Sequence, residues 1–269
     1  MTRPPTTRPP TTPLAPTTQP PAGIGFENVH VRLGETPVLR DVTVHLAART
    51  TAVIGDNGSG KSTLARVAGG LVGASAGTVT GTVRVLGLDP QREADRLRER
   101  VAFVFSNPDT QIVMPTVAED VALSLRSRRL PRAQKAALVD AALSRFGLSD
   151  LAGHGSHDLS GGQKQLLALC GAFVRDPELV IADEPTAYLD ARNARRVAGH
   201  LLADTGHRLL VVTHDLALAR RCEAAVLVAD GRVAAVGDPA DVVARYEASL
   251  RDEASGEIRA EVAPAGSRW

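Results

Sequence analysis

The sequence is poor in aromatic residues and cysteine, and it carries almost no net charge. Aromatic residues make up 3% of the 269 residues, so few side chains could stack on nucleic-acid bases. The formal net charge of +1 lacks the basic excess typical of a nucleic-acid-binding domain, and we expect no nucleic-acid partner. The two cysteines, Cys170 and Cys222, lie far apart and form no metal or redox motif, which favours a reducing compartment.

Long apolar runs are absent as well. No stretch reaches the roughly 18 apolar residues that a membrane-spanning helix needs. The N-terminus also lacks the basic segment followed by an apolar segment that is typical of a signal peptide. Any role at a membrane is therefore expected to require a separate integral partner, contacted from the cytosolic side.

The composition divides the chain into three parts. Residues 1–23 are almost entirely Thr, Pro and Arg, and such a segment buries too little apolar surface to fold, so we expect a disordered tail. Residues 24–250 alternate β-rich runs with helical patterns, which predicts one α/β domain. Residues 251–269 are charged, rich in Ala and Gly and weakly periodic, and we expect a flexible tail there.

One glycine-rich segment carries the strongest chemical signal. Residues 55–62, Gly-Asp-Asn-Gly-Ser-Gly-Lys-Ser, match G-x-x-x-x-G-K-[ST] between a predicted strand and a predicted helix. Glycines let backbone N–H groups turn toward phosphate oxygens, and the helix N-terminus adds its positive dipole end. Lys61 is expected to reach the β- and γ-phosphates, and the Ser62 hydroxyl to coordinate Mg²⁺. The predicted nucleotide-binding residues are Gly55, Asp56, Asn57, Gly58, Ser59, Gly60, Lys61, Ser62 and Thr63.

A pair of acids follows an apolar run later in the chain. Residues 179–182 predict a central strand that presents Asp183 and Glu184 at its carboxyl end. Two acids at a strand end are common by themselves, but beside a phosphate-binding loop they are the expected partners. We therefore assign Asp183 to Mg²⁺ and Glu184 to the general base that activates the attacking water.

A second glycine-containing segment, residues 159–163, opens a predicted helix that runs through Phe173. Ser160 suits the N-cap, and Gly161 and Gly162 permit close approach of a backbone, so this is a further anion site at a helix N-terminus. Two phosphate sites in one chain would serve different nucleotides.

Five motifs in this order resemble the ABC transporter ATPases across about residues 25–245. They are the phosphate loop and the segments 159–163, 179–186, 189–190 and 211–215. The resemblance implies an α/β P-loop NTPase cassette with a RecA-like core, an antiparallel β subdomain and a helical subdomain at about residues 107–170. It also implies ATP and Mg²⁺ as cofactors and ATP hydrolysis as the reaction.

The resemblance further implies that two cassettes, identical or different, share each ATP. The signature residues that would contact the γ-phosphate on the partner cassette are Ser160, Gly161, Gly162 and Gln163. His214 would bind the γ-phosphate and steady the catalytic acid, although a histidine at a strand end is more often structural outside this family. Leu189 and Asp190 match the loop that links the two sites across the dimer.

Two positions depart from the family pattern. The glutamine that usually ends the strand before the coupling loop is Ser106 here. Its side chain is shorter, so a bridging water or Gln111 could take its place. The aromatic residue that usually stacks on adenine is replaced by Leu33 or Arg32, which predicts aliphatic or cationic packing of the base.

The segment 106–122 indicates the type of transporter. Its runs Asn-Pro-Asp-x-Gln and Pro-Thr-Val-x-Glu-Asp-Val-Ala resemble energy-coupling-factor cassettes, which power micronutrient uptake. Within that group, residues 111–116 and 182–193 are most similar to the biotin-transporter ATPase, with the cobalt-transporter ATPase next. We expect a peripheral subunit at the cytoplasmic face of the cell membrane. The loop expected to grip an integral membrane subunit contains Ser106, Asn107, Pro108, Asp109 and Gln111.

The sequence leaves three alternatives open. A soluble cassette acting in DNA repair or translation would usually carry a long coiled-coil insertion or a second cassette, and neither is present. A nucleotide-binding regulator that does not hydrolyse ATP conflicts with the intact Lys61, Glu184 and His214, while Ser106 keeps it open. The basic run at residues 126–135 indicates a solvated loop and first helical turn, or else a contact with a partner or with lipid.

Overall fold

The computed structural model describes residues 23–73, 75–203 and 206–261, and the side chains as far as residue 252. The Thr/Pro-rich segment expected to be disordered lies outside the described residues except for Gly23. The last eight residues of the expected C-terminal tail, 262–269, lie outside them too.

A six-stranded sheet forms the centre of the molecule, with the strand order β5-β6-β7-β3-β8-β9. The strands from β5 to β8 pair in parallel, and β9 pairs antiparallel with β8. All five residues of β3 and of β6 are buried, as expected for parallel strands covered on both faces. In sheet order the strands are β5 (Val101–Val104), β6 (Leu179–Asp183), β7 (Arg208–Val212), β3 (Thr50–Ile54), β8 (Ala224–Ala229) and β9 (Arg232–Gly237).

Alternate residues of the central strands face two separate apolar clusters. In β3, Ala52 and Ile54 belong to the cluster beneath the helices, whereas Val53 belongs to the cluster beneath the smaller sheet. This alternation follows from strand geometry, in which successive side chains point to opposite faces. The central sheet therefore contributes side chains to both apolar clusters.

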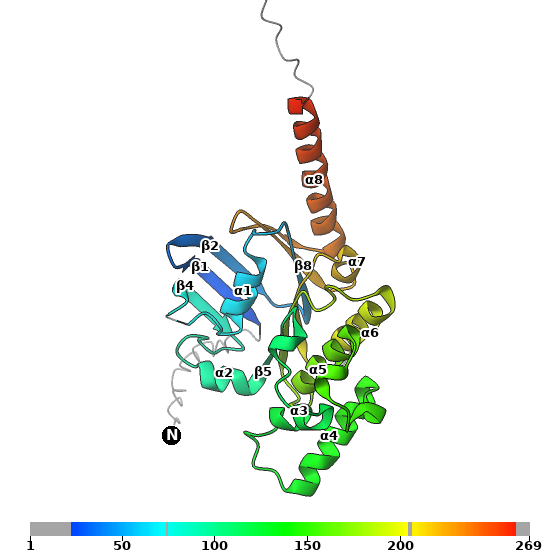
Figure 1. Ribbon diagram of the computed structural model, residues 1–269. Coiled ribbons are helices and arrows are strands. Elements are labelled where there is room, and N and C mark those ends of the chain that lie inside the picture. The colour runs from blue at the N-terminus through cyan, green and yellow to red at the C-terminus, as the bar shows by residue number, and fades with distance from the viewer. Residues whose placement is uncertain (1–22, 74, 204–205, 262–269) are drawn as a thin grey trace, which may run out of the picture.

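The smaller sheet has three antiparallel strands in the order β2-β1-β4. Figure 1 shows it at one side of the molecule, beside α1 (Lys61–Ala68). The chain then passes through α2 (Ala94–Arg100) to the edge of the larger sheet. The strands are β1 (Ile24–Leu33), β2 (Thr36–Leu46) and β4 (Gly77–Val85). This is the antiparallel β subdomain that the sequence predicted.

Helical elements fill the segment between β5 and β6 and form a lower lobe in Figure 1. Phe146 and Phe173, at the ends of α4 and α5, pack together with ring centroids 5.7 Å apart. In the basic run, Arg126, Arg128 and Arg129 are exposed, in agreement with a solvated loop. The elements are η1 (Pro108–Thr110), α3 (Val117–Ser124), α4 (Arg132–Phe146), η2 (Ser149–Leu151), η3 (Ser156–Asp158) and α5 (Gly161–Phe173).

Three more helices follow in the described part of the chain: α6 (Ala191–Leu202), α7 (Leu216–Ala219) and α8 (Pro239–Glu261). The expected loosening of the chain from Arg251 is wrong as far as Glu261, because α8 continues to that residue. The first half of α8 packs through Val242, Val243 and Tyr246, and a helix nucleated by packing extends readily into a weakly periodic segment. Its second half stands clear of the body in Figure 1.

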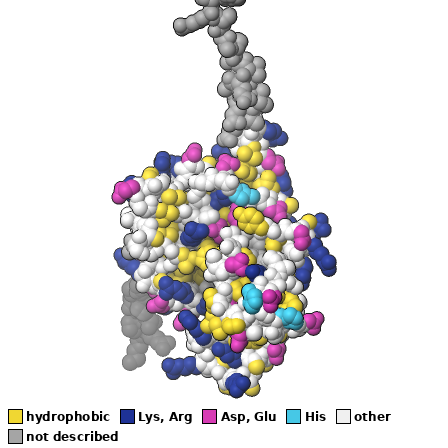
Figure 2. Space-filling view, viewed as in Figure 1, with side chains coloured by type: hydrophobic (Ala, Val, Ile, Leu, Met, Phe, Trp, Pro, Cys, Tyr) yellow, Lys and Arg dark blue, Asp and Glu magenta, His cyan; other side chains and the backbone are white. Residues whose placement is uncertain are grey.

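The mixed charge and the lack of long apolar runs in the sequence are also seen in the described structure. Figure 2 shows Lys and Arg side chains interspersed with Asp and Glu on the face in view. Among the described residues, none of the helices combines the length and the apolar composition that crossing a bilayer would require.

Candidate nucleotide-binding site

The phosphate loop follows β3 and depends on glycines at two crowded positions. Gly55 has φ of 141°, and a Cβ there would lie 2.1 Å from the carbonyl oxygen of Val228. Gly60 has φ of 104°, and a Cβ there would lie 2.7 Å from a methyl group of Leu39. Both conformations therefore favour glycine, and at Gly55 the backbone carbonyl of Val228 also leaves no space for a Cβ.

Lys61 is the first residue of α1 and is buried, with 5% of its surface exposed. Its Nζ donates a hydrogen bond to the carbonyl oxygen of Asp56 at 2.7 Å. Burial lowers the pKa of Lys61, and the negative charges of Glu184, Asp56 and Asp183 oppose that shift. The amine of Lys61 therefore lies within the loop, where a phosphate oxygen of the nucleotide can replace the Asp56 carbonyl as its hydrogen-bond acceptor.

Ser62 and Asp183 come together although 121 residues separate them. The Ser62 hydroxyl donates to Oδ1 of Asp183 at 2.7 Å, and Arg66 approaches Oδ2 of Asp183 at 3.7 Å. Asp183 is 3% exposed. A hydroxyl and a carboxylate offer the hard oxygen ligands that Mg²⁺ prefers, so the two residues suit the metal role that the sequence predicted.

Glu184 and His214 lie at the ends of neighbouring strands, β6 and β7. The backbone N–H of His214 donates to Oε2 of Glu184 at 3.2 Å, and His214 Nε2 lies 3.2 Å from Oε1. Glu184 itself has φ of 50°, and its N–H donates to the carbonyl of Val212 at 2.9 Å. A left-handed residue directly after a buried strand is a strained conformation of the kind that clusters at functional sites.

Burial raises the pKa of Glu184, whereas the charge and backbone N–H of His214 and the charge of Lys61 oppose the rise. A carboxylate with a raised pKa is a stronger base than an exposed one. The geometry therefore supports both predicted roles: Glu184 as a base and His214 as the residue that orients it.

These groups surround one pocket of about 390 Å³. The phosphate loop after β3, His214 after β7 and Glu184 after β6 meet because the carboxyl ends of parallel strands share one edge of the sheet. The lining residues are Val38, Asn57, Gly58, Gly60, Lys61, Ser62, Thr63, Glu184 and His214.

The packing of adenine against Leu33 or Arg32 stays a prediction, because this pocket is the one at the phosphate loop. Neither Arg32 nor Leu33 lines it: Arg32 pairs with Glu35 at 3.0 Å, and Leu33 packs against the core of the smaller sheet. Val38 of β2 contributes the apolar wall.

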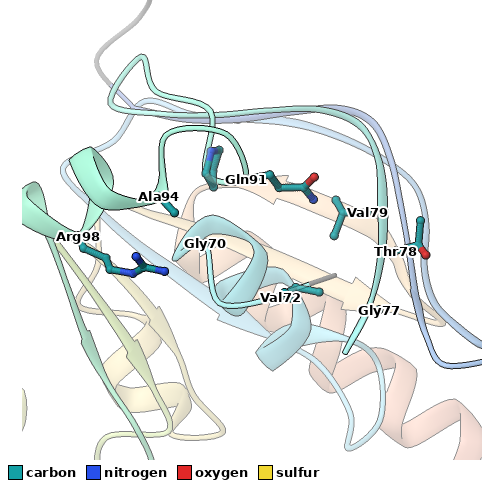
Figure 3. A pocket seen from close by; sticks show the side chains of 10 residues that line it. Gly70, Val72, Gly77, Thr78, Val79, Gln91, Ala94 and Arg98 are labelled. Carbon is teal, nitrogen blue, oxygen red and sulfur yellow. The ribbon is translucent and has the colours of Figure 1, made fainter. Parts of the chain in front are cut away.

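A larger pocket, of about 430 Å³, lies elsewhere and holds none of the site residues. Figure 3 shows it between the end of α1, the start of β4 and the segment that leads into α2. Its one charged side chain, Arg98, is paired with Asp95 at 2.6 Å. We therefore place the nucleotide at the phosphate loop, where the chemistry lies, and not in the larger cavity.

The signature residues begin α5, and the prediction of Ser160 as its N-cap is confirmed. Ser160 Oγ accepts from the backbone N–H of Gln163 at 3.4 Å, and Gln163 Oε1 accepts from the N–H of Ser160 at 2.8 Å. A Cβ at Gly162 would lie 2.5 Å from Asn193 of α6, whereas a Cβ at Gly161 would meet nothing within 4 Å. None of these four residues lines the phosphate pocket.

The loop between β6 and α6 connects the catalytic strand to α6, whose Asn193 lies against Gly162 of the signature helix. Asp190 accepts hydrogen bonds from the N–H groups of Arg192 and Asn193, both at 2.9 Å, and these bonds, led by that of Asn193, lower the pKa of Asp190. Leu189 packs against the helical core. Tyr188, which sequence reasoning missed, directly precedes Leu189 in the same loop. It is 99% exposed and has φ of 62°.

The predicted coupling segment lies beyond β5. Asn107 caps η1 by accepting from the N–H of Asp109 at 3.0 Å, and Asp109 pairs with Lys164 of α5 at 2.8 Å. Gln111 does not take over the missing glutamine's position: its amide accepts from Phe105 N–H at 2.8 Å and donates to the Phe103 carbonyl at 2.9 Å. The oxygen and the nitrogen of that amide are thus both hydrogen-bonded to the backbone at the end of β5.

Sequence reasoning also missed the residue that shapes the next part of this loop. Asp120 is 7% exposed, and its Oδ1 accepts from the N–H groups of Val113 and Met114 at 2.9 and 3.0 Å. The Val113 side chain is left 65% exposed. A buried carboxylate thus holds an apolar side chain at the surface, two residues beyond the segment that the sequence assigned to partner contact.

The fold and the pocket together define a P-loop nucleotide-binding domain. Residues 39–187, more than half of the chain, match the family model described as "ABC transporter". An ABC transporter ATP-binding protein of Deinococcus radiodurans is 43% identical over 223 residues, which cover 83% of this chain and 96% of that protein. The chain therefore belongs to the ABC transporter family, whose ATP-binding subunits are ATPases.

Two other relatives have more specific names. The biotin transport ATP-binding protein BioM of Rhizobium etli is 38% identical, with 83% of this chain and 97% of that protein covered. The energy-coupling factor transporter ATP-binding protein EcfA1 of Lacticaseibacillus paracasei is also 38% identical, with 79% and 77% covered. These relatives are transport subunits and give no support to the alternative of a cassette acting in DNA repair or translation.

Solved structures match over nearly their whole length. CbiO1 from Clostridium perfringens, described as part of the ABC transporter complex CbiONQ, has a TM-score of 0.73 and 29% identity over 88% of this chain and 98% of that chain. The ATP-binding cassette MJ0796, described as a dimer bound to ADP and Pi, has a TM-score of 0.70 and 26% identity over 80% and 98%. The predicted cassette fold, with its antiparallel and helical subdomains, is confirmed.

Proposed function

We propose that this chain is the ATP-hydrolysing subunit of an energy-coupling-factor importer and works as one of a pair of cassettes at the cytoplasmic face of the cell membrane. The observation that carries the catalytic part is the contact of Glu184 with His214 at the wall of the phosphate pocket. The relatives named for biotin transport and for the energy-coupling factor support the transport part.

In the proposed reaction, ATP binds with its phosphates on the loop at residues 55–62. Lys61 and the N–H groups at the start of α1 stabilise the negative charge that the β- and γ-phosphates carry. Mg²⁺, when bound at Ser62 and Asp183, neutralises phosphate charge. Glu184 accepts the proton of the attacking water, and His214 holds the Glu184 carboxylate toward the γ-phosphate.

The proposed dimer supplies what the pocket lacks. The signature residues cap α5 and lie outside the pocket of their own chain, and Gly161 presents open space to an approaching surface. A second cassette, of the same or a different sequence, would bring its own signature N–H groups to the γ-phosphate. Each site would then bind ATP with one chain and complete it with the other.

The proposed membrane contact lies on the segment 106–113. The Asp109–Lys164 ion pair connects this segment to the signature helix α5, and Val113 adds an exposed apolar side chain. A helix of an integral partner that docks there would press on the same element that begins with Ser160. Docking and ATP contact are thereby linked through α5.

We further propose biotin as the transported compound, with cobalt as the second candidate. The biotin-transport relative and the similarity of residues 182–193 to the biotin-transporter ATPase favour the vitamin. The CbiO1 structure supports the metal. Coexpression of the cassette with its integral partner, followed by uptake of labelled biotin and of ⁵⁷Co²⁺ with and without ATP, decides between them.

The test of the catalytic proposal is Glu184→Gln. This variant should bind ATP with unchanged affinity, form a stable ATP-dependent dimer and lose about 100-fold or more in turnover, because the water loses its base. Steady-state phosphate release, ATP affinity and size-exclusion chromatography measure the three quantities. Unchanged hydrolysis would remove Glu184 as the base, and recovery of the chain from membranes without an integral partner would remove the transport assignment.

A further inference from the structure

A hydrogen bond joins the C-terminal helix to the phosphate loop. Tyr246, on the packed half of α8, is 8% exposed, and its hydroxyl donates to Oδ1 of Asp56 at 2.9 Å. The two residues lie 190 positions apart in the chain. No motif of the family resemblance includes Tyr246, so the contact is a property of this tertiary arrangement.

Asp56 is an acid within a loop whose ligand is an anion. Its backbone carbonyl accepts from Lys61, but its side chain lies on the other side of the loop. Asp56 is missing from the wall of the phosphate pocket and instead lines a third pocket, of about 400 Å³, together with Arg245, Tyr246 and Ser249 of α8. The carboxylate is thus directed toward α8 and away from the place of the phosphates.

That direction matters because like charges repel strongly near a partly buried site. Asp56 is exposed, so no packing of its own side chain prevents rotation toward the nucleotide. The Tyr246 hydroxyl is the group that the structure places on its carboxylate. A phenol is neutral and donates a single hydrogen bond, so it can hold the carboxylate without changing the net charge of the loop.

We propose that Tyr246 is a positioning residue for nucleotide binding: it holds the Asp56 carboxylate on the α8 side of the phosphate loop and so removes a repulsion with the phosphates of ATP. Through this bond, the seating of α8 sets the affinity of the loop for nucleotide. The inference rests on the proposed function only in taking a nucleoside triphosphate as the ligand of the loop.

A matched control is available on the same helix. The neighbouring Glu247 pairs with Arg220, just after α7, at 2.7 Å and does not line the pocket that Asp56 and Tyr246 share. Glu247→Gln therefore loosens α8 without touching Asp56. If Tyr246 acted only by anchoring the helix, Tyr246→Phe and Glu247→Gln would change nucleotide binding alike.

The experiment measures the Kd of a fluorescent, non-hydrolysable ATP analogue for the full chain and its variants. Tyr246→Phe should weaken binding about three- to tenfold, the range of one lost hydrogen bond to a partly exposed charged group. Glu247→Gln should bind as the wild type does. The loss in Tyr246→Phe should shrink as salt rises, because the released charge is screened, and kcat at saturating ATP should stay unchanged.

A second substitution separates charge from anchoring. In an Asp56→Asn background, Tyr246→Phe should change the Kd less than twofold, since no charge remains to be held. A Kd of Tyr246→Phe equal to the wild type, or an undiminished loss in the Asp56→Asn background, would overturn the positioning role. Absence of binding by the wild type would instead contradict the proposed function, so the two failures are distinguishable.

Discussion

The two halves of the proposed ATP site differ in how completely one chain builds them. In the phosphate pocket Lys61 and Asp183 are buried, and each already has a hydrogen bond within the chain: Lys61 to the Asp56 carbonyl, and Asp183 from Ser62. On the signature side the corresponding groups are open, with Tyr188 99% exposed and nothing within 4 Å of a Cβ at Gly161. Hydrogen bonds within the chain thus mark the half that it builds alone, and open space at Gly161 marks the half that we propose a partner completes.

Two glycine substitutions give the largest expected contrast between these halves. Gly55→Ala would place a Cβ 2.1 Å from the Val228 carbonyl in a left-handed conformation, so we expect a loss of several kcal/mol of unfolding free energy and no ATP binding. Gly161→Ala meets open space at the first position of α5, so it should fold and bind ATP as the wild type does, yet lose hydrolysis. Thermal unfolding, ATP binding and phosphate release test both variants.

Equal stability loss in the two variants would contradict the comparison. Normal hydrolysis by Gly161→Ala would show that the signature side needs no close approach by a partner backbone.

The next effect concerns Tyr188, one of only two tyrosines in the chain. If the closed dimer buries it, Tyr188→Ala should weaken ATP-dependent dimerisation of the Glu184→Gln background about tenfold or more, as loss of a central aromatic contact does. Tyr188→Gly should weaken the dimer equally but relieve the φ of 62°, so its monomer should unfold at a higher temperature than that of Tyr188→Ala. Analytical ultracentrifugation and thermal unfolding separate the two effects.

Chemical labelling checks the same prediction without mutation. Nitration should modify Tyr188 rapidly in the nucleotide-free chain and slowly in the ATP-trapped dimer. Tyr246, which is 8% exposed, serves as the protected internal reference. Equal labelling of Tyr188 in both states would place it outside the interface.

Sequence predicted the parts of this site whose chemistry is local. The phosphate loop, Asp183 with Glu184, and the capping of α5 by Ser160 each lie within a few adjacent residues, so a motif contains the whole geometry. Three other features depend on how elements distant in the sequence pack together: Val38 lining the pocket, the hydrogen bonds of Gln111, and the contact of Tyr246 with Asp56. Neither composition nor a short motif records that alignment.

A smaller effect follows from the raised pKa of Glu184. Because the base must be deprotonated, hydrolysis should fall on the acid side at a pH above 4.5, the ordinary value for glutamate. The folded state bears the cost of a buried charge only above the raised pKa, so Glu184→Gln should raise the Tm by a few degrees at pH 8. This gain should shrink as the pH falls through the raised pKa, since wild-type Glu184 then becomes neutral as well. Unfolding scans of both proteins from pH 5 to 8 measure it.

The smallest expected effect is that of Asp109→Asn, and its size tests the link between the two surfaces. The Asp109 side chain is 63% exposed, so losing its ion pair with Lys164 should change the unfolding free energy by less than about 0.5 kcal/mol. Asp95→Asn, which removes the exposed pair with Arg98, is the matched control. In the isolated cassette both variants should hydrolyse ATP as the wild type does. In complex with the integral subunit, Asp109→Asn should lower the stimulation of hydrolysis and Asp95→Asn should not, because the Asp109–Lys164 pair connects the coupling segment to α5 and the Asp95–Arg98 pair does not. Equal stimulation in both variants would mean that docking of the integral subunit affects the signature residues by another route.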